Sequence, residues 1–157
     1  MPSYEKPDKR PDRKPKTRPN KKPDNKRPDS PPAGRVLILE NDYSNRILFA
    51  DYLEQCGYSV FPLADERKVF ESLECYQPDI LMLNLKMPVL DGFSVIEQLR
   101  SHPQWKTLAI LVVSGYSLLR DRQKAYRLGA NAYLTKPILP ADLSASVAHL
   151  IQHSAIV

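Results

Sequence analysis

Three short runs of apolar residues, each followed at once by polar residues, constrain the fold of this chain more than any other feature. They span residues 36–39, 80–83 and 108–113. None of them shows the alternation of apolar and polar residues that is typical of a strand with one face in solvent. Such runs are typical of strands in a parallel sheet that helices cover on both faces. Residues 58–61 and 132–134 are predicted to add two shorter strands.

Between these runs, apolar residues recur at the spacing of helices that lie with one face on a core. Five such patterns alternate with the five strands, which predicts right-handed βαβ units and a doubly wound, open α/β sheet. The fourth pattern runs from about 117 to 128 and ends before Gly129, since glycine is favoured directly after a helix. Asp91 is the predicted N-cap of the third helix. The apolar face predicted for the first helix consists of Leu48, Phe49, Tyr52, Leu53 and Cys56.

Residues 1–34 differ sharply in composition from the rest of the chain. They hold nine of the 15 prolines and 11 of the 23 Lys and Arg residues, but only five of the 18 Asp and Glu residues. A segment with so little apolar surface has nothing to offset the entropy lost on ordering. We therefore predict a disordered, basic, proline-rich tail at 1–34, followed by one folded domain at 35–157.

Several classes of protein are excluded by what the sequence lacks. No run approaches the roughly 18 apolar residues of a membrane-spanning helix, and the basic N-terminus has no apolar core of a secretory signal. Cys56 and Cys75 show no metal-ligand spacing, so we expect two buried, reduced thiols. The sequence predicts a cytoplasmic protein that is not transmembrane.

Polar side chains follow four of the predicted strands. Glu40 and Asn41 follow the first strand, Asn84 the third, Ser114 the fourth and Lys136 the fifth. In a doubly wound sheet the carboxyl ends of the central strands line a crevice, where ligands bind. We expect these side chains to meet there, although any α/β protein begins its loops with polar residues.

Four segments resemble landmarks of the response-regulator receiver domains of two-component signalling. Residues 78–92 (PDILMLNLKMPVLDG) resemble the phosphoacceptor segment, and residues 36–46 (VLILENDYSNR) are similar to the acidic first loop. Residues 111–115 (LVVSG) resemble the switch segment, and residues 129–137 (GANAYLTKP) are similar to the closing strand. The likeness covers about 35–152, and it implies a flavodoxin-like (CheY-like) sheet with strand order 2-1-3-4-5.

The resemblance implies roles for the matched positions. Asn84 occupies the phosphorylated position, which is aspartate in active members of the family. Glu40 and Asn41 occupy the acidic pair that holds Mg²⁺. Ser114 stands at the hydroxyl that binds the phosphoryl group. Lys136 stands at the lysine that pairs with the acceptor carboxylate or its phosphate, and we expect it to hydrogen-bond Glu40 and the Asn84 carbonyl here.

Two further features follow from the resemblance. Tyr133 stands at the aromatic residue whose rotamer reports the state of the opposite surface in the family. The bond between Lys136 and Pro137 is expected to be cis, an isomer that proline makes accessible.

Two asparagines in the crevice change its chemistry. Phosphoryl transfer requires a carboxylate nucleophile, and the amide of Asn84 is neutral and a poor nucleophile. Magnesium prefers anionic oxygens, and Glu40 is the one carboxylate left among the three matched positions. We therefore predict a pseudo-receiver that binds no Mg²⁺, has no other cofactor and is not an enzyme. The alternative is a displaced phosphoacceptor, at Asp42 or Asp91.

Three functions remain open on the sequence alone. The first is a phosphorylation-independent interaction module that binds a histidine kinase or another signalling protein, or a second copy, through the fourth helix, fifth strand and fifth helix. The second is a regulator phosphorylated at a displaced aspartate. In the third, the tail makes weak, non-specific contact with nucleic acid or an anionic surface; a tail that only aids solubility is the simpler interpretation.

Overall fold

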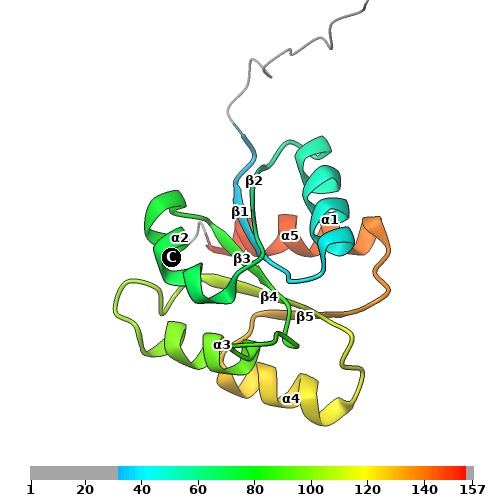
Figure 1. Ribbon diagram of the computed structural model, residues 1–157. Coiled ribbons are helices and arrows are strands. Elements are labelled where there is room, and N and C mark those ends of the chain that lie inside the picture. The colour runs from blue at the N-terminus through cyan, green and yellow to red at the C-terminus, as the bar shows by residue number, and fades with distance from the viewer. Residues whose placement is uncertain (1–31, 155–157) are drawn as a thin grey trace, which may run out of the picture.

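Strands and helices alternate along the computed structural model, which describes residues 32–154 (Figure 1). All but the last three residues of the predicted tail therefore lie outside the described residues. The elements, in chain order, are β1 (Arg35–Leu39), α1 (Tyr43–Gln55), β2 (Ser59–Leu63), the 3-10 helix η1 (Glu66–Lys68), α2 (Val69–Tyr76), β3 (Ile80–Leu83), α3 (Gly92–Ser101), β4 (Ala109–Ser114), α4 (Leu119–Leu128), β5 (Ala132–Thr135) and α5 (Pro140–Ser154).

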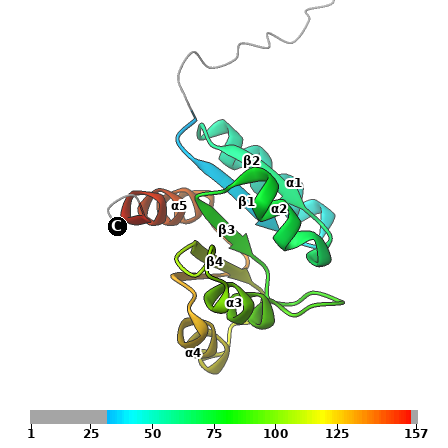
Figure 2. The same ribbon diagram turned by 90° about the vertical axis from the view of Figure 1, so that its left-hand side faces the viewer.

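The five strands form one parallel sheet in the order β2-β1-β3-β4-β5. This confirms the predicted doubly wound α/β fold and its strand order. Helices α1 and α5 cover one face of the sheet, and α2, α3 and α4 cover the other (Figures 1 and 2). The order reverses at β1, so the carboxyl ends of β1, β3 and β4 border the crevice that such a reversal creates.

The core has two halves because neighbouring residues of a strand point to opposite faces. In β1, Leu37 and Leu39 pack toward α2 and α3, whereas Val36 and Ile38 pack toward α1 and α5. Every residue of β3 and β4 is buried. Burial on both faces explains why β3 is wholly apolar and why β4 is apolar up to its last residue, Ser114.

The helix ends near the crevice are fixed by two aspartates and a glycine. The carboxylate of Asp42 accepts the Asn45 N–H at 2.8 Å and caps α1. Asp91 accepts the Phe93 N–H at 2.7 Å and caps α3, as predicted. Gly92 follows, and a Cβ there would lie 2.6 Å from the Asn84 carbonyl oxygen. Glycine thus lets the start of α3 pack directly against the end of β3.

Two predictions about apolar side chains were wrong. Leu48 is 64% exposed, since α1 buries Phe49, Ala50 and Leu53 and so turns Leu48 toward solvent. Both cysteines are exposed rather than buried. Cys56 is the C-cap of α1, and Cys75 lies on the outer face of α2, which buries Val69, Ser72 and Leu73.

The amino end of the described segment lies along the sheet. The Ala33 N–H donates to the Gly57 carbonyl at 3.0 Å, and the Ser59 N–H donates to the Gly34 carbonyl at 2.9 Å. Ala33 and Gly34 therefore join the domain ahead of β1. Among residues 32–154, no helix combines the length and apolar character that crossing a bilayer requires.

Candidate functional site

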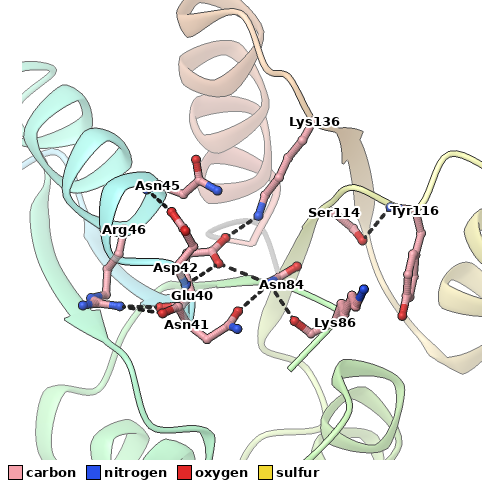
Figure 3. Close-up of polar contacts among 10 residues, drawn as sticks. All are labelled: Glu40, Asn41, Asp42, Asn45, Arg46, Asn84, Lys86, Ser114, Tyr116 and Lys136. Carbon is pink, nitrogen blue, oxygen red and sulfur yellow. Dashed lines mark hydrogen bonds and ion pairs between the residues drawn. The ribbon is translucent and has the colours of Figure 1, made fainter. Parts of the chain in front are cut away.

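Four of the six predicted site residues line one crevice at the carboxyl ends of the strands (Figure 3). They meet there because β1, β3 and β5 run parallel and end at the same edge of the sheet. The crevice encloses about 360 Å³. Its lining consists of Glu40, Asn41, Asp42, Asn84, Lys86, Gly115, Tyr116 and Lys136.

The amide nitrogen of Asn84 lies at the centre of three oxygens. It donates to Asn41 Oδ1 at 2.9 Å, to the Lys86 carbonyl at 3.0 Å and to Glu40 Oε1 at 3.2 Å (Figure 3). A carboxylate and a backbone carbonyl can only accept, so these contacts fix which end of the amide faces them. The side chain is 7% exposed. Directly after β3, this chain therefore presents a hydrogen-bond donor in the crevice.

Glu40 is buried but fully partnered. Its Oε2 lies 2.6 Å from the ammonium of Lys136, and its Oε1 accepts the Asp42 N–H at 3.0 Å as well as the Asn84 amide. A buried carboxylate is tolerated when it is paired and hydrogen-bonded in this way. Within residues 32–154, Lys136 hydrogen-bonds Glu40 and does not hydrogen-bond Asn84, so the expected bond to the Asn84 carbonyl was wrong.

Ser114 and Tyr133 do not line the crevice themselves, but both hold the loop after β4 through the backbone of Tyr116, which does line it. The hydroxyl of fully buried Ser114 accepts the Tyr116 N–H at 3.1 Å. The hydroxyl of buried Tyr133 donates to the Tyr116 carbonyl at 2.6 Å, and the Arg122 guanidinium lies 5.2 Å from the centre of its ring. Burial raises the pKa of the Tyr133 phenol. The bond between Lys136 and Pro137 is cis, as expected.

Sequence reasoning missed the structural roles of three residues at this site, although it had named Asp42 as a possible displaced acceptor. Asp42 caps α1, which its position three residues before Asn45 could have indicated. The guanidinium of Arg46 donates to the Glu40 carbonyl at 2.9 Å and to the Asn41 carbonyl at 3.3 Å, and it thereby fixes the loop that carries both residues. The carbonyl of Lys86 is a backbone group, and no side-chain pattern could have shown its role.

The loop between β3 and α3, which borders the crevice, is held by a buried glutamate that does not itself line the crevice. Glu66, 3% exposed, accepts the Val89 N–H at 2.6 Å and the Leu90 N–H at 3.2 Å. Burial alone would raise the pKa of this carboxyl, but bonds from its own N–H and from those of Val89 and Leu90 outweigh it and lower the pKa. Glu66 thus fixes the segment between β3 and α3.

Replacing this carboxylate should destabilise the domain in a pH-dependent way. We expect Glu66→Gln to lower the free energy of unfolding by about 1–2 kcal/mol at pH 7, because hydrogen bonds to a charged acceptor are replaced by weaker ones. Since the folded pKa lies below the unfolded one, the contribution is complete above about pH 4.5 and is lost as pH falls through the folded value.

Urea unfolding at pH 7 and at acid pH measures this effect. The native chain and the Gln variant should differ at pH 7 and converge in acid. Glu71→Gln, on the exposed side of α2, is the control and should have little effect at either pH. Equal stability of the two Glu66 forms at pH 7 would show that the carboxylate does not stabilise the loop.

Comparison with known proteins places this geometry in a family. Residues 36–148 match the model of the response regulator receiver domain. A 14.6 kDa protein of Leptolyngbya boryana, described only by its place beside sodA1, is 34% identical over 108 residues, which are 69% of this chain and 82% of that protein. Other curated relatives are longer. The chain spans 18% of the length of protein RcaC of Microchaete diplosiphon, and 50% of the length of each of two transcriptional regulators, PhoP of Bacillus subtilis and RpaA of Synechocystis.

Solved structures agree with that match. Chemotaxis protein CheY4 of Vibrio cholerae is 26% identical with a TM-score of 0.70, over 74% of this chain and 97% of that one. The receiver domain of the sensor histidine kinase PA1611 of Pseudomonas aeruginosa is 27% identical with a TM-score of 0.69, over 76% of this chain and 98% of that one. The PA1611 domain was solved with a magnesium ion in its active-site cleft.

Proposed function

The chain belongs to the response regulator receiver domain family of two-component signalling, and from that premise we propose that it is a pseudo-receiver: an interaction module that works without phosphorylation. One observation carries the proposal. The side chain at the acceptor position, Asn84, donates its amide N–H groups to Glu40, Asn41 and Lys86. An acceptor must present a nucleophilic oxygen to the phosphoryl donor. Here the atom in that place is an amide nitrogen whose lone pair is delocalised.

We propose also that the crevice does not bind Mg²⁺, since its residues do not fit this ion. Mg²⁺ needs an octahedral set of hard oxygens, with one or two carboxylates among them. Glu40 is the carboxylate that faces the centre of the crevice, and the Lys136 ammonium already lies 2.6 Å from it. The Asn84 N–H groups occupy the space between the three oxygens. A cation there would displace a donor and face the positive end of an amide dipole.

The two aspartates that could serve as displaced acceptors both cap helices. Asp42 lines the crevice, but its Oδ1 accepts the Asn45 N–H. Asp91 lines a different recess and accepts the Phe93 N–H. A hydrogen bond from a backbone amide makes a carboxylate oxygen less nucleophilic. These contacts favour the pseudo-receiver over a displaced phosphoacceptor.

The face formed by α4, β5 and α5 is the one we propose for binding a histidine kinase or another signalling protein. Its shape is held by contacts that involve no phosphate: the Tyr133 hydroxyl donates to Tyr116, and the Arg122 guanidinium donates to Thr135 Oγ1 at 3.3 Å. These bonds join β5 to the loop before α4 and to α4 itself. The face therefore has a defined structure while Asn84 remains unmodified.

Magnesium titration tests the proposal directly. Adding millimolar Mg²⁺ should leave the amide chemical shifts of Glu40, Asn41 and Asn84 unchanged, because no anionic oxygen cluster is present to replace the water around the ion. Calcium at the same concentration controls for a general ionic effect. Sub-millimolar Mg²⁺ affinity with shifts confined to these residues would contradict the argument from charge.

For the tail, we propose that residues 1–31 are not needed for folding. Deleting them removes 11 Lys and Arg and five Asp and Glu residues, but keeps the backbone bond between Ala33 and Gly57. The shortened chain should unfold cooperatively, within about 1 kcal/mol of the full chain. Urea unfolding measures this, and a loss of cooperative unfolding would mean that the tail packs on the domain.

Nucleic-acid binding by the tail should be weak. A net charge of +6, from 11 basic and five acidic residues, supports non-specific contact that salt screens. We expect the full chain to bind a DNA duplex only at low salt, and the shortened chain to bind it less. Affinity that persists at physiological salt would favour a nucleic-acid function for the tail.

A further inference from the structure

Helix α4 carries an uncompensated positive charge on an exposed surface. Its ten residues include four cations and a single carboxylate, Asp121. The cations are Arg120, Arg122, Lys124 and Arg127, and all four are exposed. Only Ala125 of this helix is buried. Most of α4 is therefore available to a partner.

The cations form a stripe with an apolar stripe beside it. Arg120, Lys124 and Arg127 follow the i, i+4, i+7 spacing that places side chains in one row along a helix, about 10 Å long. The neighbouring row contains Leu119, 68% exposed, and Tyr126, 45% exposed. The surface thus combines a basic row with two apolar side chains that nothing in the described part of the chain covers.

Contacts with aromatic rings hold two of the cations in place without neutralising them. The Lys124 ammonium lies 4.3 Å from the centre of the Phe93 ring, and Arg122 lies over Tyr133. Among the described residues, no ion pair involves α4. The two ion pairs found there are Arg67–Asp65 and Lys136–Glu40. A cation on a ring keeps its full charge. Lys124, in the middle of the stripe, is thus held in place with its charge free to pair with an anion.

The basic residues of α4 also disfavour self-association of the chain through the face formed by α4, β5 and α5. A twofold interface brings the same patch of both copies together, so the acids that could face α4 of the partner are Asp121 of α4 itself and any on β5 or α5. β5 contains no acidic residue, and α5 contains Asp142 in its first turn as its single one. Pairing two copies here would place basic residues against basic residues.

We propose that α4 binds an acidic surface of a different signalling protein, whose carboxylates face the basic stripe and whose apolar side chains cover Leu119 and Tyr126. This inference rests on the proposed interaction-module function and specifies its partner. The apolar row favours a protein over nucleic acid because Leu119, its more exposed member, offers nothing to a phosphate backbone and cannot stack on bases as the ring of Tyr126 could. Charged interfaces with apolar anchors are typical of specific, salt-sensitive protein recognition.

Selection from a displayed library of random short peptides, with the full chain as bait, tests the proposal. Enriched peptides should be rich in Asp and Glu and should contain Leu, Ile or Phe. The strongest one, synthesised and labelled, should bind the triple variant Arg120→Glu, Lys124→Glu, Arg127→Glu at least about tenfold more weakly than the native chain, as measured by fluorescence polarisation. Leu119→Ala with Tyr126→Ala should weaken the same peptide severalfold.

The matched control reverses the same number of charges elsewhere. Lys14→Glu, Lys16→Glu and Lys21→Glu lie in the tail, ahead of the amino end of β1, which is on the far side of the molecule from α4 (Figure 1). This variant should bind the peptide within about twofold of the native chain. Glutamate is as good a helix former as the residues replaced, and cooperative unfolding of each variant confirms that α4 is intact.

Four results would overturn the proposal. The first two are enriched peptides without acidic residues, and peptide binding that the α4 and tail variants weaken equally. The third is that the α4 charges govern binding of DNA rather than of peptide. The fourth is self-association, measured by sedimentation equilibrium, that the α4 variant abolishes. The peptide assay contains no phosphoryl donor. Phosphorylation of the native chain would therefore refute the pseudo-receiver function and leave this result unaffected.

Discussion

A variant that carries Asn41→Asp together with Asn84→Asp should gain one phosphoryl group on incubation with acetyl phosphate and Mg²⁺, whereas the mass of the native chain should stay unchanged. The variant restores a carboxylate nucleophile and raises the number of carboxylates at the three matched positions from one to three. At 4 Å and an effective dielectric of about 20, each added charge attracts a divalent ion by several kcal/mol. Intact mass spectrometry gives the result directly.

The single variants separate the two effects. Asn84→Asp alone restores the nucleophile. Because position 41 still lacks a carboxylate, this variant should be phosphorylated more slowly than the double variant. Asn41→Asp alone should remain unmodified, since it has no acceptor. The adduct should be labile to hydroxylamine, as an acyl phosphate is. If the native chain itself gains this group, the pseudo-receiver proposal fails, and Asp42→Asn and Asp91→Asn would then locate the displaced acceptor.

The double variant should also become dependent on Mg²⁺ for stability. A carboxylate oxygen in place of the Asn84 nitrogen would face Glu40 Oε1 and the Lys86 carbonyl at about 3 Å, where the native chain has hydrogen bonds. A cation that binds only the folded state offsets this repulsion and raises the melting temperature with concentration. The native chain should show no such dependence in a thermal-shift measurement.

Lys136→Met should cost about 3 kcal/mol of folding free energy, the largest stability effect that we expect from a single substitution in the crevice. It leaves the carboxylate of Glu40, which is 2% exposed, without its counter-ion. Removing one partner of a buried pair is costly because the other charge stays buried and unpaired. Methionine keeps most of the apolar stem of lysine, so the loss of folding free energy comes mainly from removal of the positive charge. Urea unfolding at pH 7 measures it.

Two controls test whether the pair is responsible. Adding Glu40→Gln to Lys136→Met should bring stability back to within about 1 kcal/mol of the native chain, because no unpaired charge remains. Arg67→Met breaks the exposed pair with Asp65 and should cost less than about 1 kcal/mol. A double variant that is no more stable than Lys136→Met would show that the ammonium does more than neutralise Glu40.

The sequence predicted those parts of the structure that follow from backbone direction and burial. Strands β3 and β4 were predicted because burial on both faces requires wholly apolar runs. Glu40, Asn84 and Lys136 were expected to meet because parallel strands end at one edge of the sheet. The orientation of the Asn84 amide was beyond such reasoning, since it depends on the carbonyl of Lys86. Leu48 and Cys75 were misplaced because apolar side chains also occur on outward helix faces.

Glu66 shows a different limit. It lies ahead of α2, and it stabilises the loop after β3 by accepting two backbone N–H groups. Neither its position in the sequence nor its residue type distinguishes it from the exposed Glu71. A bond from a side chain to the backbone of a distant loop leaves no periodic pattern in the sequence.

The pair of Glu40 and Lys136 has a consequence for synthesis on the ribosome. The two residues are 96 positions apart in sequence, and β3 and β4 lie between the strands that carry them. In a nascent chain that has released β1 through β4, Glu40 has no counter-ion, because Lys136 is still inside the exit tunnel. Such an intermediate remains short of full stability until β5 and its lysine leave the exit tunnel. The acid directly after the first strand therefore makes completion of the domain depend on the lysine directly after the last strand.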